Sequence, residues 1–515
     1  MTLSPYYVTT TIPYVNARPH LGFALELVQA DVLARHHRRL GEPVRLLTGT
    51  DDNSLKNVLA AEAEGVPTAE LVDRNAKAFA ALHEPLELGF DDFLRTSSDP
   101  RHRLGVARLW RACAQSGDLY RKYYQGWYCV DCEQFYPPEE LIDGRCPEHG
   151  TEPQLVAEEN WFFRLSRYEE KLRTLIESGE LRIEPPARRN EVLGFLAGGL
   201  TDFSISRSRS RARGWGIEVP DDPEQVIYVW WDALGNYITS LGYGADDPNH
   251  RRWWVSGGRR VHLLGKGVLR FHAVYWPAML LSAGEPLPTD LLVHDYLTAN
   301  GQKISKSLGN TVDPVDLVRR YGVDAVRWWL LREVPRVGDV DFTEERLIAR
   351  ANEDLANDLG NLINRVITMI HRYRNGFPPE PERDAGDDAT ALVEAIDAAP
   401  EKVADAFAGG DFRRAVAAVW RIVEEGNRYV ERARPWALAK AERAGDAGAG
   451  RELDDALALL LTAGRALAEQ LAPFLPGAAA RIAAQCAVSA DDGGPAPGRL
   501  PPAQPLFPRI EPHRR

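Results

Sequence analysis

The sequence predicts an α/β protein in which a parallel, doubly wound sheet is split by an insertion and followed by an all-α bundle. Strand-like apolar runs alternate with helical stretches near the N-terminus, and this alternation returns after about residue 224. The segment between the two parts is rich in Cys, Pro, Arg and aromatic residues and lacks this alternation of strand-like and helical segments. After about Asn352, Ala and Leu recur at helical spacing without strand signals, which predicts the bundle.

The N-terminal part supplies the first strands. Tyr6–Ile12 is β-branched and aromatic, and Val44–Leu47 is a second apolar run that ends in the turn Thr48–Asp51. Between them, His20–Leu40 has a helical pattern. Because ligands of doubly wound sheets bind beyond the carboxyl ends of the strands, we expect a site there.

The second part of the sheet is expected from Ile227–Trp230 and Val261–Leu264, both followed by Gly or polar residues. The tail after Ser489 is rich in Pro and Gly, and we expect Leu506–Pro508 to pin it to the surface. These observations divide the chain into residues 1–115 and 224–291 for the split α/β domain, 116–223 for the insertion, 292–351 for a short connecting domain and 352–515 for the bundle with its tail.

Size and composition exclude several classes of protein. At roughly 150 residues per domain, 515 residues make about three domains. The chain is 44% hydrophobic and 26% charged, which excludes wholesale disorder and fibrous repeats. The net charge of 62 − 74 = −12 gives no overall positive field for nucleic acid, although a local basic face remains open.

The chain is expected to be a cytoplasmic protein with no membrane segment. Its start lacks the basic residues and long apolar stretch of a signal peptide. The most apolar later stretch, Leu453–Leu475, is interrupted by charged residues and predicts an amphipathic helix of a bundle.

The cysteines indicate a metal site rather than disulfides. Five cysteines are too few and too unevenly placed for a disulfide scaffold. A CxxC pair followed by a CxxH pair supplies the ligands of a closed tetrahedral zinc site, which is structural because no position remains for water. The predicted ligands are Cys129, Cys132, Cys146 and His149. The alternative is a set of reduced, buried cysteines beside a surface histidine.

Two further segments indicate phosphate binding. His20-Leu21-Gly22 lies where a loop enters a helix, so backbone N–H groups and the helix dipole favour an anion there, and Gly22 allows a flat base to approach. Lys303-Ile304-Ser305-Lys306-Ser307 places two lysines in a polar loop, where they could neutralise charge on a transferring phosphate. Taken singly, each segment also fits a structural accident or a solvated basic loop.

Together these two segments resemble the signatures of the class I aminoacyl-tRNA synthetases, and their surroundings resemble the methionyl-tRNA synthetase family. The resemblance runs in order over nearly the whole chain. It rests on Thr11–Asn16, Thr48–Asp51, Val229–Tyr237, Gly265-Lys266, Arg270–Ala278 and Val293-His294.

The resemblance implies a Rossmann-like catalytic domain, an insertion whose zinc knuckle contacts the tRNA acceptor end, a stem-contact domain with the lysine loop, and an anticodon-binding bundle. It implies an ATP-dependent ligase that activates L-methionine with Mg-ATP to methionyl adenylate and transfers it to tRNA(Met). Mg²⁺ with ATP and a structural Zn²⁺ are the cofactors expected. A monomer is expected, since the chain ends shortly after the bundle.

The resemblance also assigns the site residues. The catalytic groups are His20, Lys303 and Lys306, and ATP binding adds Gly22, Gly265, Lys266 and His294. The residues expected to bind methionine are Ile12, Tyr14, Asp51, Trp230, Ala233, Leu234, Tyr237, Val268, Phe271 and His272. Among them, Asp51 is expected to bind the α-ammonium group and His272 to turn toward the sulfur. Anticodon reading falls to Asn361, Arg365, Pro435 and Trp436.

Four positions near the adenylate site depart from the family pattern. Phe23 stands where a second His or an Asn is common, Asn53-Ser54 replaces His-Gly, and Gly267 replaces Asp. Ile304 for Met in the lysine loop is conservative. We expect these departures to affect rate and inhibitor sensitivity more than the type of reaction, and, since all lie near the adenylate site by analogy, we expect them to compensate one another.

Two rival functions stay open at this point. One is an amino-acid-adenylating paralogue with another acceptor, or a duplicate synthetase insensitive to an inhibitor. The other is a non-catalytic tRNA-binding protein.

Overall fold

Two compact units make up the chain. The computed structural model describes residues 4–130, 133–147, 150–299, 301–304, 309–380, 387–488 and 498–511. The first unit comprises residues 1–84 and 88–296, and the second comprises residues 85–87 and 297–515.

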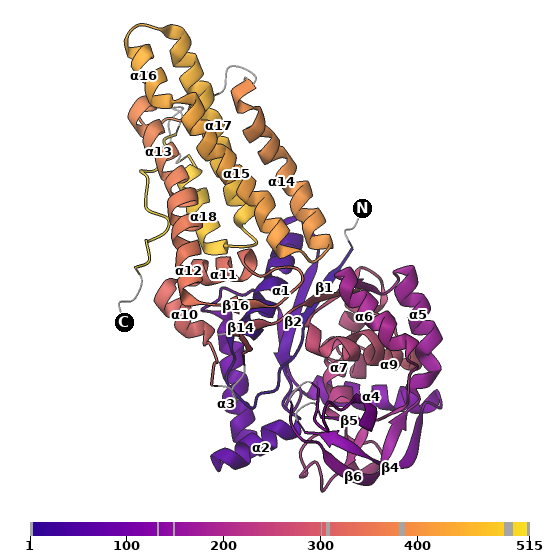
Figure 1. Ribbon diagram of the computed structural model, residues 1–515. Coiled ribbons are helices and arrows are strands. Elements are labelled where there is room, and N and C mark those ends of the chain that lie inside the picture. The colour runs from indigo at the N-terminus through magenta and orange to yellow at the C-terminus, as the bar shows by residue number, and fades with distance from the viewer. Residues whose placement is uncertain are drawn as a thin grey trace. The chain divides into compact units, whose positions relative to one another are not determined.

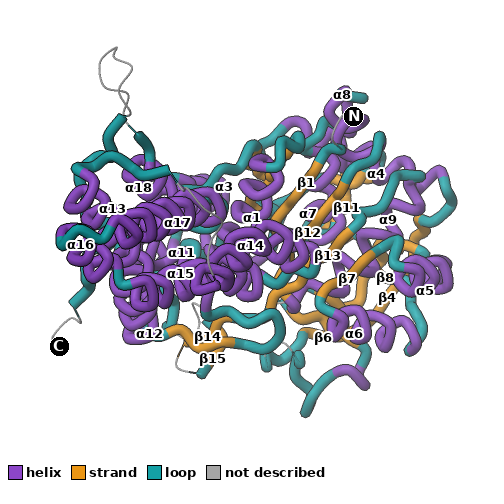
Figure 2. Tube along the Cα trace, turned by 90° about the horizontal axis from the view of Figure 1, so that it is seen from above, coloured by secondary structure: helices purple, strands orange, loops and turns teal. Residues whose placement is uncertain are grey.

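A six-stranded parallel sheet forms the centre of the first unit (Figure 2). Its central strand, β1, is buried along its whole length and pairs with β2 on one side and β12 on the other. In order across the sheet the strands are β3 (Asp92–Arg95), β2 (Val44–Thr50), β1 (Tyr6–Thr10), β12 (Arg259–Gly265), β13 (Asp290–His294) and β7 (Arg182–Glu184).

The order of the strands creates a crevice. From β1 the chain moves to β2 and β3 on one side, and after the insertion it returns to β12 and β13 on the other side. Connections therefore leave β1 and β12 in opposite directions, which opens a binding crevice at their carboxyl ends. The helices between and after the strands of this sheet are, in chain order, α1 (Leu21–Arg39), α2 (Leu55–Glu64), α3 (Thr68–Ala80), α4 (Pro100–Gln115), α7 (Val229–Thr239) and α9 (Trp276–Ala283).

The expected strand at Ile227–Trp230 is wrong. Strand β11 (Asp222–Ile227) ends at Ile227, and helix α7 begins at Val229 after the extended residue Tyr228. Helix α7 is buried on nearly all sides, so its start is a continuous apolar run, and such a run has no periodicity that separates a strand from a helix.

Antiparallel sheets occupy most of the inserted segment. One has the order β5-β4-β6-β8 and the other β10-β11-β9, and the short strand β7 from the same segment completes the edge of the parallel sheet. The remaining elements of this unit are β4 (Leu119–Cys129), β5 (Gln134–Tyr136), β6 (Gln154–Phe163), α5 (Glu169–Ser178), α6 (Pro186–Ala197), β8 (Phe203–Ser204), β9 (Ser206–Ser208), β10 (Glu218–Val219) and α8 (Pro248–His250).

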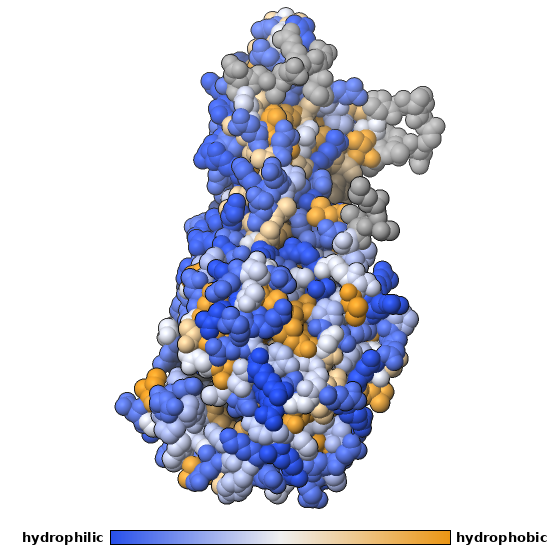
Figure 3. All heavy atoms as spheres, turned by 90° about the vertical axis from the view of Figure 1, so that its right-hand side faces the viewer, coloured by the Kyte–Doolittle hydropathy of each residue, from blue (hydrophilic) through white to orange (hydrophobic). Residues whose placement is uncertain are grey.

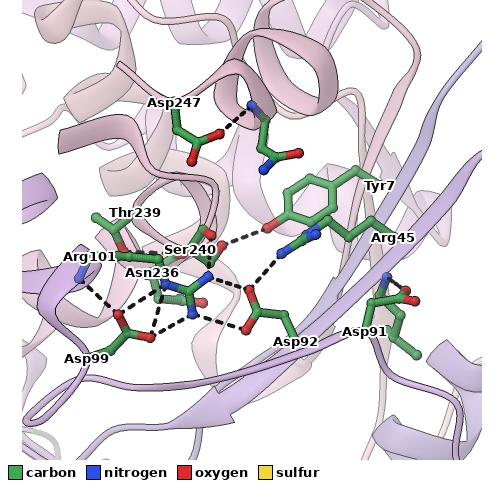
Figure 4. Close-up of polar contacts among 12 residues, drawn as sticks. Tyr7, Arg45, Asp91, Asp92, Asp99, Arg101, Asn236, Thr239, Ser240 and Asp247 are labelled. Atoms are coloured by element: carbon green, nitrogen blue, oxygen red, sulfur yellow. Dashed lines mark hydrogen bonds and ion pairs between the residues drawn. The ribbon is translucent and has the colours of Figure 1, made fainter. Parts of the chain in front are cut away.

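A polar network holds the end of α7 against the sheet (Figure 4). The Tyr7 hydroxyl of β1 donates a hydrogen bond to the carbonyl of Tyr237 at 2.8 Å. Arg101 of α4 donates to the carbonyl of Ser240 at 2.8 Å and pairs with Asp92 of β3 at 2.9 Å. The last turn of α7 is thereby tied to two strands and to α4.

Helices dominate the second unit, as the spacing of Ala and Leu predicts (Figure 1). This unit also contains a small sheet of order β15-β14-β16 near its start. The elements are β14 (Leu297–Ala299), β15 (Gln302–Lys303), α10 (Pro314–Tyr321), α11 (Val323–Arg332), β16 (Val340–Phe342), α12 (Glu344–Arg350), a π-helical stretch (Ala351–Gly360), α13 (Asn361–Arg374), α14 (Thr390–Ala408), α15 (Phe412–Ala433), α16 (Pro435–Arg443), α17 (Ala447–Leu471) and α18 (Pro476–Cys486).

The described part of the C-terminal tail lies on the bundle. The side chain of Gln485 exchanges two hydrogen bonds of 3.0 Å with the backbone of Gln504, and Asn352 does the same with Ile510 at 2.8 Å. Leu506 is buried between these contacts, which confirms that the tail is pinned there.

Within the described residues, no helix is both long and apolar enough to cross a membrane. On the face drawn in Figure 3, apolar side chains form separate small patches among hydrophilic ones.

The close crossing of α4 and α7 gives a test of the fold. A Cβ atom at Gly105 would lie 2.4 Å from Thr239 Cγ2, whereas one at the exposed Gly194 of α6 would meet nothing within 4 Å. We expect Gly105→Ala to lower the free energy of unfolding by about 1–3 kcal/mol through overpacking. Gly194→Ala should raise it by roughly 0.5–1 kcal/mol through helix propensity. Urea unfolding of the full chain measures both, and equal effects would contradict the crossing.

Candidate functional site

The residues predicted to bind small ligands converge on the carboxyl ends of the parallel strands. Tyr14 follows β1 and forms an isolated bridge with Asp51, which directly follows β2. Gly265 ends β12 and His294 ends β13. These residues therefore lie at the carboxyl ends of the strands, where doubly wound sheets bind their ligands.

His20 caps the N-terminus of α1 at this crevice. Its Nδ1 accepts a hydrogen bond of 3.1 Å from the N–H of Gly22, so the neutral ring carries its proton on Nε2. A Cβ atom at Gly22 would lie only 3.0 Å from His20 Cε1. No acidic residue lies in the first turn of α1, so no carboxylate of that turn offsets the positive end of the helix dipole, which favours an anion.

Phe23 lies in the core. Its ring is buried and packs edge-on against Phe79 of α3, with 5.1 Å between ring centroids. At this departure from the family pattern, the side chain serves packing between α1 and α3.

Asp51 lies in a buried acidic environment. Its Oδ1 accepts a hydrogen bond of 3.2 Å from the N–H of Asn53. Burial raises the pKa of Asp51 well above its usual range, and the nearby charges of Asp232 and Glu133 raise it further. An excess of carboxylates at one buried point is a binding environment for a cation.

Asn53 joins this acidic environment to α7. Its Nδ2 donates a hydrogen bond of 2.7 Å to Asp232 Oδ2, while His102 Nε2 donates to Asp232 Oδ1 at 2.5 Å. Asp232 and His102 are fully buried and Asn53 is half-buried, so Asp232 is a buried carboxylate with a partner on each oxygen.

Aromatic rings line the apolar side of the crevice. Trp230 of α7 stacks on Phe271 with 3.7 Å between centroids and an interplanar angle of 4°, and Tyr14 lies 6.5 Å from Trp230 in an edge-on arrangement. Ala233 and Leu234 are buried on α7, and Ile12 is half-buried after β1.

His272 closes the apolar side as a neutral ring. Its Nδ1–H donates to the carbonyl of Val268 at 2.8 Å, so its Nε2 accepts from the hydroxyl of Tyr237 at 2.7 Å. Burial lowers the pKa of His272 to about 4. Neutral rings and one hydroxyl suit a weakly polar ligand group such as a thioether.

His294 is positively charged, in contrast to His272. Its Nε2 donates to Glu26 Oε2 and its Nδ1 to the carbonyl of Asp295, both at 2.9 Å, so both nitrogens carry protons. Burial would lower the pKa of His294, but the hydrogen bond and charge of Glu26 outweigh it and raise the pKa.

Gly267 leaves space for a tyrosine. A Cβ atom at Gly267 would lie 2.0 Å from the Tyr296 hydroxyl oxygen. The Tyr296 ring also lies under Lys266, whose Nζ is 4.7 Å from the ring centroid. At this departure from the family pattern, the volume beside Gly267 is filled by the side chain of Tyr296, the last residue of the first unit.

Two of the four predicted zinc ligands lie in the described residues. Cys129 and Cys146 are buried with Tyr136 in one small cluster, and Cys132 and His149 lie outside the described residues. Glu133 and Gly150, which directly follow the two pairs, have left-handed φ values of 53° and 64°. The chain therefore turns sharply after each pair.

The lysine loop belongs to the second unit. Lys303 ends strand β15, Ile304 is buried, and Lys306 lies outside the described residues.

The predicted anticodon residues lie near one end of the bundle. Arg365 of α13 pairs with Glu431 of α15, with 2.8 Å between Nη2 and Oε1, and Asn361 is exposed one turn earlier. Helix α15 ends two residues after Glu431, and α16 begins with Pro435 and Trp436. The Trp436 side chain is 41% exposed, so its ring offers a stacking surface.

Sequence reasoning missed four residues that organise the site. Glu26 also accepts hydrogen bonds from the backbone and side chain of Thr11, at 2.5 and 2.6 Å, and so joins β1, α1 and β13. A single charge inside the apolar run Phe23–Val28 is the signal that could have identified it. His102, Glu133 and Tyr296 had no comparable signal, because their partners are distant in sequence.

Comparison with known sequences covers both units. The pattern of the family described as tRNA synthetases class I (M) matches residues 6–154 and 137–367. The pattern of the family described as anticodon binding domain of methionyl tRNA ligase matches residues 379–496. Methionine–tRNA ligase of Mycobacterium leprae is 41% identical over 528 residues, covering 99% of this chain and 96% of the relative. Methionine–tRNA ligase of Thermotoga maritima is 43% identical over 442 residues, covering 84% and 68%.

Solved structures agree with these matches. Mycobacterium tuberculosis methionyl-tRNA synthetase in complex with methionyl-adenylate has a TM-score of 0.92 at 40% identity, covering 98% of this chain and 100% of that chain. The apo form of the same enzyme has a TM-score of 0.85 at 38% identity, covering 99% of each chain.

The pairing of Gly267 with Tyr296 is testable by a double-mutant cycle. We expect Gly267→Ala to lower the free energy of unfolding by about 1–3 kcal/mol, because its Cβ meets the Tyr296 hydroxyl. In the Tyr296→Phe background the nearest atom is the ring carbon Cζ at 3.2 Å, so the cost should fall by about half or more. Thermal unfolding of the four proteins measures this, and additive effects would show that the two residues do not interact.

Proposed function

This chain belongs to the methionyl-tRNA synthetase family of class I synthetases, and from that premise we propose a role for each part of its site. The activity is that of a methionine–tRNA ligase. The methionine carboxylate attacks the α-phosphorus of ATP and pyrophosphate leaves. The terminal ribose hydroxyl of tRNA(Met) then attacks the adenylate carbonyl, and AMP and the hydroxyl proton leave. No protein nucleophile is needed, so the residues act by alignment and charge stabilisation.

The observation that carries this proposal is the two-sided crevice between β1 and β12. The neutral aromatic side formed by Trp230, Phe271 and His272 suits the thioether of methionine. The acidic side at Asp51 suits its α-ammonium group. A substrate with an apolar end and a cationic end is oriented by these two sides.

The phosphate side of the crevice is cationic. His20 can donate from Nε2 at the start of α1, and the charged ring of His294 lies at the end of β13 beside Gly265 and Lys266. We assign these groups to ATP, which arrives with Mg²⁺. Lys303 and Lys306 of the second unit would neutralise charge on the leaving pyrophosphate.

The knuckle residues fit a structural zinc ion. Two buried cysteines from separate pairs lie in one cluster, and a residue in the left-handed conformation follows each pair. Thiolates of Cys129, Cys132 and Cys146 and the imidazole of His149 would hold the metal, which supplies cross-linking of the turns and no chemical step.

The bundle would read the anticodon. Trp436 offers a ring for an unstacked base, while Asn361 and Arg365 offer donors for base edges. We also propose that the chain acts in the cytoplasm as a monomer, which light scattering of the purified protein would test.

An amino-acid-dependent ATP–pyrophosphate exchange panel tests the function, followed by charging of initiator and elongator tRNA. Methionine should support exchange and both tRNAs should be charged. Exchange without charging would indicate a paralogue with another acceptor. Binding of tRNA without exchange, even at high enzyme concentration, would indicate a non-catalytic RNA-binding protein.

For the anticodon assignment, we expect Trp436→Ala to lower tRNA charging efficiency at least about tenfold, because base–aromatic stacking contributes about 1–3 kcal/mol. Methionine-dependent exchange should not change. Trp436→Phe keeps a stacking ring and serves as the matched control. If exchange falls as much as charging, Trp436 is a packing residue.

For the knuckle, we expect purified protein to contain about one zinc ion per chain. Cys146→Ser should lose most of it, while Cys113→Ser, which changes a buried cysteine outside the knuckle, should retain it. Elemental analysis measures this without reference to activity. Equal zinc content in the two variants would rule out the assigned ligands.

A further inference from the structure

A carboxylate from the knuckle turn reaches the amino-acid end of the crevice. Glu133 lies directly after the second cysteine of the CxxC pair, in a left-handed conformation, and is only 4% exposed. Its Oε1 accepts a hydrogen bond from the Ser54 hydroxyl and lies 3.4 Å from the N–H of Lys56. Ser54 and Lys56 begin α2, three and five residues after Asp51.

Capping of α2 does not account for this buried carboxylate. Ser54 already caps the helix, since its Oγ accepts a hydrogen bond of 3.1 Å from the N–H of Lys56. An amide at position 133 could accept the same hydrogen bonds without the cost of burying a charge. The charge itself therefore needs another explanation.

The hydroxyl of Tyr14 indicates what the charge is for. This hydroxyl is buried and has no hydrogen-bond partner among the described residues. Tyr14 pairs with Asp51 in an isolated β-bridge, and Glu133 is hydrogen-bonded to Ser54, three residues after Asp51. Burial raises the pKa of Tyr14 well above its usual range, and the charges of Glu133 and Asp51 raise it further. An ammonium group brings three N–H donors and a positive charge, which matches an unpartnered oxygen between two carboxylates.

Burial raises the pKa of Glu133, and the hydrogen bond from Ser54 and the nearby charges of Arg207 and Lys56 oppose that rise. Lys56 Nζ lies over the Tyr14 ring, 5.5 Å from its centroid. Arg207 stacks on Tyr228, 4.4 Å from the ring centroid, and donates to the backbone carbonyl of Glu133 rather than to its side chain.

We propose that Glu133 is a substrate-binding residue whose charge, together with that of Asp51, binds the α-ammonium group of the amino acid. This inference rests on the proposed function and adds to it a residue supplied by the inserted knuckle rather than by the parallel sheet. It makes the position of the knuckle turn part of the amino-acid site.

The variant Glu133→Gln tests this, because it removes the charge and keeps an acceptor for Ser54. We expect the KM for L-methionine in exchange to rise about tenfold, equivalent to about 1.4 kcal/mol. The KM for ATP and kcat should stay within about twofold. Glu139→Gln, an exposed position on the same insertion, is the matched control and should leave every constant unchanged.

A ligand without the ammonium group separates charge from packing. By calorimetry, 4-(methylthio)butanoate should bind wild type and Glu133→Gln equally, while L-methionine binds the variant about tenfold more weakly. Equal weakening of both ligands, or of neither, would overturn the proposal. If Glu133→Gln does not fold, Glu133→Asp replaces it as the test, because it keeps the charge. The affinity for L-methionine divided by that for 4-(methylthio)butanoate should then equal the wild-type ratio. A lower ratio would overturn the proposal. Failure of wild type to bind L-methionine would instead overturn the proposed function.

Discussion

The geometry of the site depends on the placement of helix α7, which carries most of the aromatic side of the crevice. Asp232 in its first turn is completely buried and accepts hydrogen bonds from Asn53 and His102. A buried carboxylate is tolerated only with such partners, so the helix cannot rotate without exposing an unpaired charge to the interior. At its other end, Tyr7 and Arg101 bind carbonyls of the last turn. Fixed at both ends, α7 presents Trp230 to the crevice in one orientation.

Opposite electrostatics on the two sides of the crevice follow from this placement. On the apolar side the hydrogen bonds of His272 to a carbonyl and a hydroxyl keep its ring neutral. At the end of β13 the carboxylate of Glu26 makes His294 a cation. At the end of β2 Asp51 has carboxylates as neighbours. The proposed positions of the thioether, phosphate and ammonium groups therefore differ in their electrostatics, although β2 and β13 belong to one parallel sheet.

The sequence predicted the α/β sheet, the helical bundle and the family correctly, because each depends on local pattern or on ordered motifs. It failed at Ile227–Trp230, where a helix buried on all sides looks like a strand. It also gave no indication that Arg182–Glu184 joins the parallel sheet, since three residues carry no periodicity. His102 and Glu133 were not identified because a side chain buried against a partner 130 or 79 residues away leaves no local signature.

The four departures from the family pattern have partners in this chain, which explains how they can coexist with the family's reaction. Phe23 packs on Phe79, and Gly267 makes room for the hydroxyl of Tyr296. Asn53 holds Asp232, and Ser54 holds Glu133. Each partner is itself buried or at the crevice. Replacing one of these four residues by the residue common in the family would therefore place it among side chains that fit the residue found in this chain. The departures are therefore a set of local adjustments around an unchanged arrangement of strands, and single reversions are expected to cost stability rather than restore a lost function.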